Sequence, residues 1–550
     1  MSVLSVRRTG KRFTIAPVRG NGEGRLRDLA GFVSLSATAN RIASEISELI
    51  GDRYWRLEYS KLVAADGFAV IGQAREIAEQ ARTGEPEQLF SGVVDNARVR
   101  FACAHDLAAS GHNVAGLGAM KLFLRLRYCL SVLTAFSVWL WTLLRSGWGN
   151  RLAAIPEGAC LIAVHGENSN RTRHALVAAG QSDAVAAILV LGRPAASLDS
   201  VRATFSSEFG LGDMPVCRPI GIGAALKCLP RLFGLFAAGS GIVSATGFIP
   251  RWQDEIAILY RICFGTGACA WWTDQGAAPG TIIYGQTGLA DTSLLEHTQQ
   301  QAGAKTVHWV HGLSGGWNFA GYSDLGLFKC GYDADLHAGL PDYGRTDFIL
   351  LPKVGYRGGR GSRWLLMTNY AHPSNPYFGH GAYDLEIAAV RMAAEAAEQT
   401  GIGKDNLVWR PHPVFWSLPD IARKRICATV GELGVALPTA GGEAPSFSDY
   451  QAVMCTPSTV AIDALATGHL PIIVAPHEIA AETVYDAFPL RAADAGELYD
   501  AVGRIADSSA AAGLYDKLWE SVRPGAPAIT IGDITERLAS GLRSAESDPV

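Results

Sequence analysis

Short apolar runs alternate along much of this chain with segments whose apolar residues recur at helical spacing. Residues 159–164, 184–191 and 364–368 are runs typical of buried strands. Residues 382–400 have helical periodicity and are followed by Gly401, a residue type that commonly closes a helix. Because strands that alternate with helices form βαβ units, the pattern predicts an α/β fold with parallel sheets.

The alternating pattern occurs in two stretches. We expect residues 155–345 and 350–540 to form two Rossmann-like domains that face each other. The junction, residues 339–363, is rich in glycine, proline and arginine, a composition that indicates a hinge or loop. Closure of two such domains around a reactive donor would exclude water from it.

The first 150 residues show a different pattern. Residues 1–27 contain seven lysines or arginines and one acid, Glu23, without the apolar run of a signal peptide. We expect a basic tail, which either lies solvated or contacts anionic lipid. Residues 28–150 have mostly helical periodicity and predict a helical extension.

One segment of this extension is apolar enough to suggest membrane contact. Residues 128–144 are uncharged, and their length is at the lower limit of the ~17–25 residues that span a bilayer. Basic residues flank both ends, so the charges do not indicate an orientation. Three alternatives stay open, namely an interfacial or re-entrant helix, a transmembrane helix, and a helix buried between domains.

Charge and cysteine usage narrow the class of protein. A net charge of −4 and aromatic residues scattered along the chain argue against nucleic acid as a partner. The ten cysteines form no CxxC pair or disulfide framework, so we expect reduced, mostly buried thiols. These observations predict a cytoplasmic enzyme.

Residues 407–474 contain the most specific motifs. His412 and Pro413 follow one apolar run, and Ser458 and Thr459 follow a second and open a short helix that precedes Gly468 and another apolar run. Ligands of open α/β sheets bind at the carboxyl ends of the strands, and a Ser-Thr pair at a helix start offers hydroxyls and backbone N–H groups to a phosphate. The order of these motifs predicts a nucleotide site.

This passage resembles the nucleotide-binding domain of GT-B glycosyltransferases. It is most similar to bacterial capsule and surface-polysaccharide transferases, namely the sialyl-, polysialyl- and Kdo-transferases, with teichoic acid glycerophosphotransferases as cousins. The resemblance implies that His412 and Pro413 contact the nucleotide and that Ser458 and Thr459 contact its phosphate. It also implies an acidic residue beyond the Ser-Thr pair, commonly Glu, where this chain has the shorter Asp463.

The same resemblance suggests two candidates for the catalytic base. Sialyltransferases of this class carry an acidic-acidic-Gly motif in the first domain, which Asp274-Gln275-Gly276 matches in part. His311-Gly312 resembles the His-Gly loop that lies at the reaction centre of the glycerophosphotransferase-like relatives. A carboxylate or an imidazole beside the acceptor hydroxyl can each act as a general base, so both alternatives stay open.

A third pattern, Asp333-Ala334-Asp335, resembles the DxD motif that holds a metal-bound nucleotide in GT-A transferases. DxD is short and arises often by chance, and here it falls at the end of the first predicted domain. GT-B enzymes neutralise the leaving phosphate with histidine, hydroxyls and helix N-termini instead. We therefore expect neither a metal site nor a cofactor.

The resemblance implies an inverting transferase that moves a sugar from a nucleotide-sugar donor, a CMP-linked ulosonic acid of the sialic acid or Kdo type, to a surface glycan or glycolipid. A lipid-linked acceptor would place the enzyme at the inner face of the cytoplasmic membrane, with peripheral membrane contact. The alternatives are a UDP-sugar or CDP-glycerol-type transferase, a UDP-sugar 2-epimerase, and a non-catalytic glycan-assembly factor.

Overall fold

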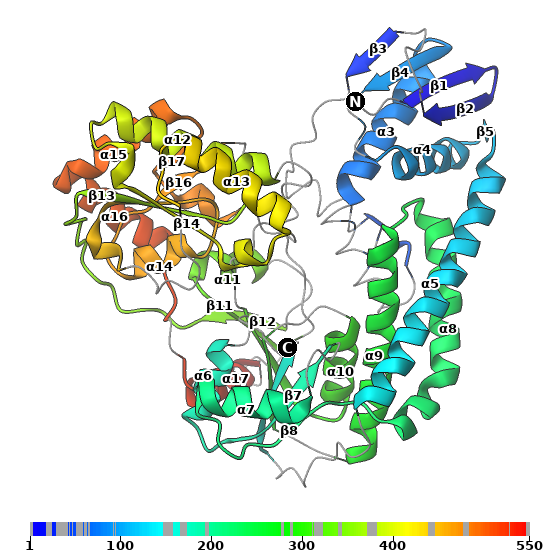
Figure 1. Cartoon of the computed structure of the whole chain (residues 1–550). Helices are drawn as coiled ribbons and strands as arrows, with labels where there is room; N and C mark the ends of the chain where they lie inside the picture. The colour runs from blue at the N-terminus through cyan, green and yellow to red at the C-terminus, as the bar shows by residue number, and fades with distance from the viewer. Residues whose placement is uncertain are drawn as a thin grey trace.

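The computed structural model contains three β-sheets and the helices that cover them (Figure 1). The residues that it describes are 4–17, 25–28, 42, 45–46, 48–50, 55, 59, 63, 67–91, 93, 95–146, 158–165, 173–192, 197–276, 280–285, 290–310, 312, 323–338, 344–370, 382–437, 446–476, 483–526 and 529–545.

The N-terminal unit is a five-stranded sheet packed against helices, and most of its strands come from the segment expected to be a basic tail. Its order is β3-β4-β1-β2-β5. Leu4, Val6, Phe13 and Ile15 alternate with more polar residues and are buried, which is the two-residue period of a strand with one covered face. The expectation of a tail was therefore wrong. The elements of this unit are β1 (Leu4–Thr9), β2 (Arg12–Pro17), β3 (Arg25–Asp28), α3 (Phe68–Thr83), β4 (Glu87–Ser91), α4 (Asn96–Ala109) and β5 (Asn113–Val114).

The second sheet has seven strands, all parallel, in the order β12-β11-β10-β9-β6-β7-β8. The chain therefore winds outward from β6 in one direction and from β9 in the other, which is the doubly wound arrangement. The strands are β6 (Cys160–His165), β7 (Val185–Leu191), β8 (Val216–Cys217), β9 (Thr281–Tyr284), β10 (Lys305–Trp309), β11 (Leu325–Phe328) and β12 (Arg345–Phe348).

Helices cover both faces of this sheet. Ile162 and Val164 of β6 face one core, whereas Leu161 and Ala163 face the other. The first core includes α6 (Arg173–Gly180), α7 (Leu198–Phe209) and the C-terminal helix α17 (Ile531–Ala545). The second includes α8 (Ile222–Thr246), α9 (Trp252–Gln275), α10 (Ala290–Gln301) and α5 (Leu117–Ser146).

Two predicted domain boundaries differ from the structure. Residues up to 540 were assigned to the second domain, but Ile531 and Ile534 of α17 pack on the first sheet, where Arg537 pairs with Asp347 at 3.0 Å. The predicted break at 150–155 divides one continuous core, because α5 packs on α9. There Glu255 is buried, and it accepts hydrogen bonds from Arg127 at 3.1 Å and Ser131 at 2.5 Å.

The third sheet has five parallel strands in the order β14-β13-β15-β16-β17. The chain moves from β13 to β14 on one side and then returns to β15 on the other, so β13 and β15 form the topological switch point. The mixed α/β fold with parallel sheets is confirmed. The elements are β13 (Arg363–Thr368), α12 (Ala382–Gln399), β14 (Leu407–Pro411), α13 (Asp420–Glu432), β15 (Tyr450–Cys455), α14 (Val460–Ala466), β16 (Ile472–Val474), β17 (Arg491–Ala492), α15 (Ala495–Ala506) and α16 (Ser508–Val522).

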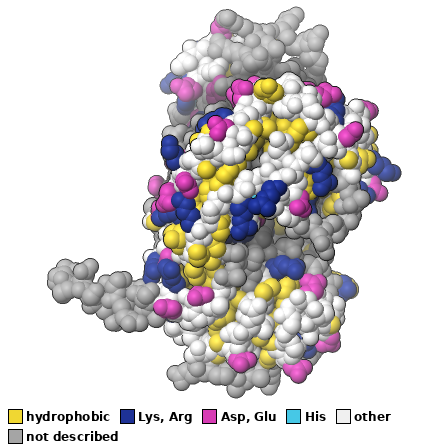
Figure 2. Space-filling view, turned by 90° about the vertical axis from the view of Figure 1, so that its left-hand side faces the viewer, with side chains coloured by type: hydrophobic (Ala, Val, Ile, Leu, Met, Phe, Trp, Pro, Cys, Tyr) yellow, Lys and Arg dark blue, Asp and Glu magenta, His cyan; other side chains and the backbone are white. Residues whose placement is uncertain are grey.

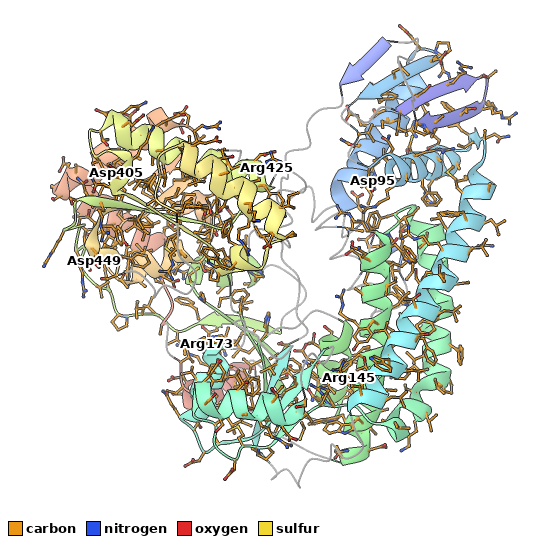
Figure 3. The ribbon with its side chains drawn as sticks, viewed as in Figure 1. Asp95, Arg145, Arg173, Asp405, Arg425 and Asp449 are labelled. Atoms are coloured by element: carbon orange, nitrogen blue, oxygen red, sulfur yellow. The ribbon has the colours of Figure 1, made fainter. Side chains whose placement is uncertain are left out.

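Two chain segments connect the second and third sheets, and they are hydrogen-bonded to each other. The N–H of Leu351 donates to the carbonyl of Pro524 at 2.9 Å, and the N–H of Ala526 donates to the carbonyl of Ile349 at 2.6 Å. The outgoing segment then lies on the third sheet's domain, where the N–H of Arg357 donates to the carbonyl of Gly468 at 2.8 Å. Figure 3 shows the side chains that fill the two α/β domains, with Asp405 and Asp449 labelled in one and Arg173 in the other.

Candidate functional site

The switch point of the third sheet is cross-linked by two polar side chains. Asn369 follows β13 and Thr456 follows β15, so both lie at the carboxyl edge. The N–H of Asn369 donates to the Thr456 hydroxyl at 3.0 Å, and that hydroxyl donates to the side-chain carbonyl of Asn369 at 2.8 Å. The Asn369 amide also donates to the carbonyl of Pro457 at 2.9 Å. This pairing fixes the position of the loop that carries Ser458 and Thr459.

His412 lies at the same edge, directly after β14. Its N–H donates to the carbonyl of Thr368 at 2.7 Å, and its side chain is exposed. Pro413 begins a short 3₁₀ helix (Pro413–Ser417) directly after β14 and His412. Because β14 neighbours β13, the structure places His412 and the Asn369–Thr456 pair at the ends of adjacent strands.

A buried polar chain supports the end of β13. The Trp409 indole N–H donates to the Thr368 hydroxyl at 2.9 Å, and this hydroxyl donates to the carboxylate of Glu386 on α12. Tyr370 donates to the carbonyl of Val474 at 3.3 Å, and burial raises its pKa. Each of the three donors, Trp409, Thr368 and Tyr370, has an acceptor, so this hydrogen-bond network can hold the strand end rigidly.

The Ser458 hydroxyl is buried and has no hydrogen-bond partner among the described residues. It does not cap α14, whose N-cap position is Thr459 and has no side-chain capping bond. A buried polar group without a partner costs ~1–3 kcal/mol. A ligand atom that accepts a hydrogen bond from this oxygen would therefore recover free energy on binding.

Two pairs of residues, each with one member from either domain, show that the second and third sheets approach each other near the Ser458–Thr459 loop. A Cβ built on Gly312, just beyond β10, would lie 3.9 Å from Cγ2 of Thr459. Asp463 on α14 lies within electrostatic range of Lys329, which follows β11. These relations place Gly312 and Lys329, which follow strands of the second sheet, near Thr459 and Asp463, which follow β15 of the third sheet.

Asp463 is an acid at the rim of this junction. Its side chain is solvent-accessible, yet the protein that surrounds it raises the pKa of its carboxyl by desolvation. The positive charge of Lys329 lowers the pKa and opposes this effect. A carboxyl in such a half-enclosed position can accept a hydrogen bond from a polar ligand.

Asp274 lies in a different environment. It is in the last turn of α9, because the apolar run before it is helical and ends at Gly276, which adopts a left-handed conformation. Its carboxylate is 39% exposed and pairs with Lys227 at 2.6 Å. The chain then reaches the amino end of β9, whereas Gly312 follows the carboxyl end of β10. His311, the other candidate base, lies outside the described residues and is the chain neighbour of Gly312.

The two aspartates of the DxD pattern do not converge. Asp333 is buried in α11 (Gly331–Ala338), and Asp335 is exposed and pairs with Arg523. Within the described part of the chain, no group of three or more His, Cys, Asp or Glu side chains could hold a metal ion.

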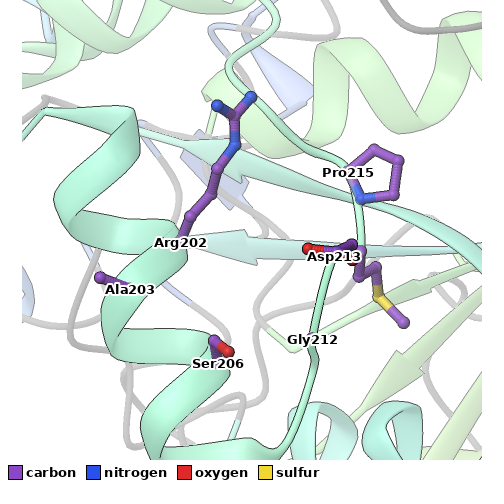
Figure 4. A pocket seen from close by; sticks show the side chains of 7 residues that line it. Arg202, Ala203, Ser206, Gly212, Asp213 and Pro215 are labelled. Atoms are coloured by element: carbon purple, nitrogen blue, oxygen red, sulfur yellow. The ribbon is translucent and has the colours of Figure 1, made fainter.

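A pocket of about 440 Å³ lies away from these motifs, between α7 and the segment before β8 (Figure 4). Arg202 extends along one wall, where its guanidinium donates to the carbonyl of Val216 at 3.1 Å. None of the predicted site residues lines this pocket.

Sequence reasoning missed Asn369, Thr456 and Lys329 as members of the site. Asn369 is the first polar residue after an apolar strand run, which is the signal that selected His412. Lys329 follows β11 in the same way, but its relation to Asp463 depends on how the two sheets meet.

No protein-family model matches the chain, and no curated protein matches it. Among solved structures, the S. aureus MnaA-UDP co-structure is similar at 12% sequence identity with a TM-score of 0.37. The alignment covers 71% of this chain and 99% of that one.

Proposed function

We propose that this chain is a glycosyltransferase of the GT-B type, which binds a nucleotide sugar between its two parallel sheets. The closeness of Gly312 and Thr459 carries this proposal, because it joins motifs that lie far apart in sequence. In this reading the third sheet's domain holds the donor nucleotide and the second sheet's domain presents the acceptor. The donor class, a CMP-linked ulosonic acid, and the glycan or glycolipid acceptor follow from the resemblance of the motifs.

The polar groups at the switch point suit a phosphate. The buried Ser458 hydroxyl can donate to a phosphate oxygen, and the exposed His412 imidazole can donate a second hydrogen bond. Both groups would stabilise the negative charge that develops as the bond between the sugar and the phosphate breaks. This is the largest electrostatic demand of the reaction, and these residues can meet it without a metal.

We assign the base to His311 rather than Asp274. The acceptor oxygen attacks the anomeric carbon, the bond to the nucleotide phosphate breaks, and the base takes the acceptor proton. His311 is adjacent in the chain to Gly312, which faces Thr459, whereas Asp274 is paired with Lys227 at a helix end. An imidazole titrates near neutral pH and needs little adjustment to accept this proton.

Nucleotide binding tests the donor assignment. A ligand at 100 times its Kd adds about 2.7 kcal/mol to the stability of a folded protein. Because the proposed donor is a CMP-linked sugar, we expect CMP to raise the thermal midpoint more than CDP or UDP. His412→Ala and Ser458→Ala should each reduce this effect. Ser446→Ala, at an exposed serine just before the strand β15, is the matched control and should leave it unchanged.

The remaining outcomes separate the alternatives. Preferential stabilisation by UDP would replace the donor class with a UDP-sugar and favour a UDP-sugar transferase or 2-epimerase. Binding of CMP without release of free CMP from a CMP-sugar in the presence of acceptor would favour a non-catalytic assembly factor. No stabilisation by any of the three nucleotides would contradict the proposal as a whole.

A further inference from the structure

Helix α5 exposes an apolar stripe along most of its length. Eight of its large hydrophobic side chains are between 41% and 66% exposed. Their spacing of mostly three or four residues places them on one face of the helix, over about 33 Å. Six are leucines, at positions 122, 126, 130, 133, 140 and 144, and Phe123 and Trp141 complete the stripe.

Helix α8 lies beside α5 and enlarges this apolar surface. Leu226 and Phe233 of α8 are 64% and 69% exposed, and the Tyr128 hydroxyl of α5 donates to the Phe236 carbonyl of α8 at 2.9 Å. Ten of the seventeen exposed large hydrophobic side chains in the described part of the chain are on these two helices. We call this the α5–α8 surface. A large exposed apolar patch of this kind commonly marks an interaction site.

The charges of the α5–α8 surface are of one sign. Arg127 pairs with Glu255 and Lys227 with Asp274, but both acids belong to α9. Arg125 and Arg145 are exposed beside the stripe, and Figure 3 labels Arg145 at the end of α5. By contrast, the face in Figure 2 carries charged side chains of both signs. The two helices contain no acid, and their cations are Lys121, Arg125, Arg127, Arg145, Lys227 and Arg231.

An apolar stripe with cations and no acids is complementary to an anionic lipid surface. Apolar side chains enter the boundary between headgroups and acyl chains, and the cations contact lipid phosphates. We propose that the α5–α8 surface binds the face of an anionic bilayer and lies parallel to it. This inference does not depend on the proposed transferase activity.

The register of the helices favours surface binding over a transmembrane bundle, although both helices have the length and composition to span. The two helices run in opposite directions (Figure 1), and the Tyr128–Phe236 hydrogen bond sets their register. Lys227 and Arg231, which precede Phe236, therefore lie level with residues that follow Tyr128, in the uncharged part of α5. A spanning bundle would bury both cations in hydrocarbon, which is unfavourable.

Vesicle flotation with the full chain tests the proposal. We expect binding to phosphatidylcholine vesicles that contain phosphatidylglycerol, and at least tenfold weaker binding to pure phosphatidylcholine or at high salt. Leu126→Asp with Leu133→Asp should reduce binding at least tenfold, because both side chains lie in the stripe. Ile421→Asp, at a residue of α13 that is 83% exposed, is the control and should bind as the wild type does.

Further measurements distinguish surface binding from misfolding, from a transmembrane span and from dimer formation. An unchanged thermal midpoint of the double variant shows that it is folded. If the stripe enters the bilayer, brominated lipid should quench the tryptophan fluorescence of Trp141, and this quenched component should be absent in Trp141→Phe. Equal binding of the double variant and the wild type would overturn the proposal. So would resistance to alkaline extraction, which indicates a span, or a lipid-free dimer that the stripe substitutions dissociate.

Discussion

Asn369 and Thr456 exchange two hydrogen bonds across the switch point of the third sheet, at 3.0 and 2.8 Å. Thr456→Val keeps the side-chain shape but removes the hydroxyl that joins the two loops. We expect a loss of ~1–3 kcal/mol of stability, because a buried polar group is left without its partner. Urea unfolding of Thr456→Val, Asn369→Ala and the double variant measures the coupling, and strictly additive effects would contradict it.

Ser458→Ala should separate binding from stability. The Ser458 hydroxyl is buried and unpartnered among the described residues, so its removal should leave the free energy of unfolding unchanged or increase it. If the hydroxyl donates to a nucleotide phosphate, the same change should weaken nucleotide binding by ~1.5–3 kcal/mol, about 10- to 150-fold. Calorimetric titration and thermal unfolding of one preparation give both quantities. A stability loss with unchanged affinity would assign the hydroxyl a structural role.

The general base can be assigned from two conservative variants. We expect His311→Gln to lower turnover by roughly 10²–10⁴ at saturating donor, while donor affinity persists. Asp274→Asn keeps the side-chain volume and should change turnover by less than threefold, because Asp274 pairs with Lys227. Acceptor-dependent nucleotide release measures both rates. The opposite ranking would restore Asp274 as the base, and two near-normal rates would leave the mechanism without either.

The α/β class could be predicted because several buried strands are short apolar runs, as in β7 and β13. The N-terminal strands were missed because the many basic residues of this segment suggested a tail, although Leu4, Val6, Phe13 and Ile15 follow the two-residue period of a strand. The short apolar run 268–272, just before Asp274, belongs to the helix α9, and such a run cannot be told from a strand because a helix buried among other helices is apolar on every side.

The site could be predicted only within each domain. His412, Ser458 and Thr459 follow apolar runs, and that local signal is enough to place them at a sheet edge. The closeness of Gly312 and Thr459 depends on the angle between two sheets that are joined by the crossing segments near Ile349 and Pro524. No local pattern in the sequence encodes that angle.

Acidification should destabilise the chain through His337. This residue is buried on α11, its ring is 4.4 Å from that of Phe328, and burial lowers its pKa from 6.5 to about 4. Between these values the unfolded chain binds a proton that the folded chain does not, so stability falls as the pH falls. The full effect is about 3 kcal/mol. The thermal midpoint measured from pH 7.5 to 4 should show this decrease.

The variant His337→Gln isolates this contribution. Its amide can still donate to the carbonyl of Asp333, which the His337 ring contacts at 2.7 Å, but it cannot ionise. We expect a smaller decrease between pH 6.5 and 4, although part persists because burial also lowers the pKa of His469. His297→Gln, at a half-buried position on α10, is the control and should keep the wild-type slope. If both variants keep that slope, His337 is not the group whose protonation opposes folding.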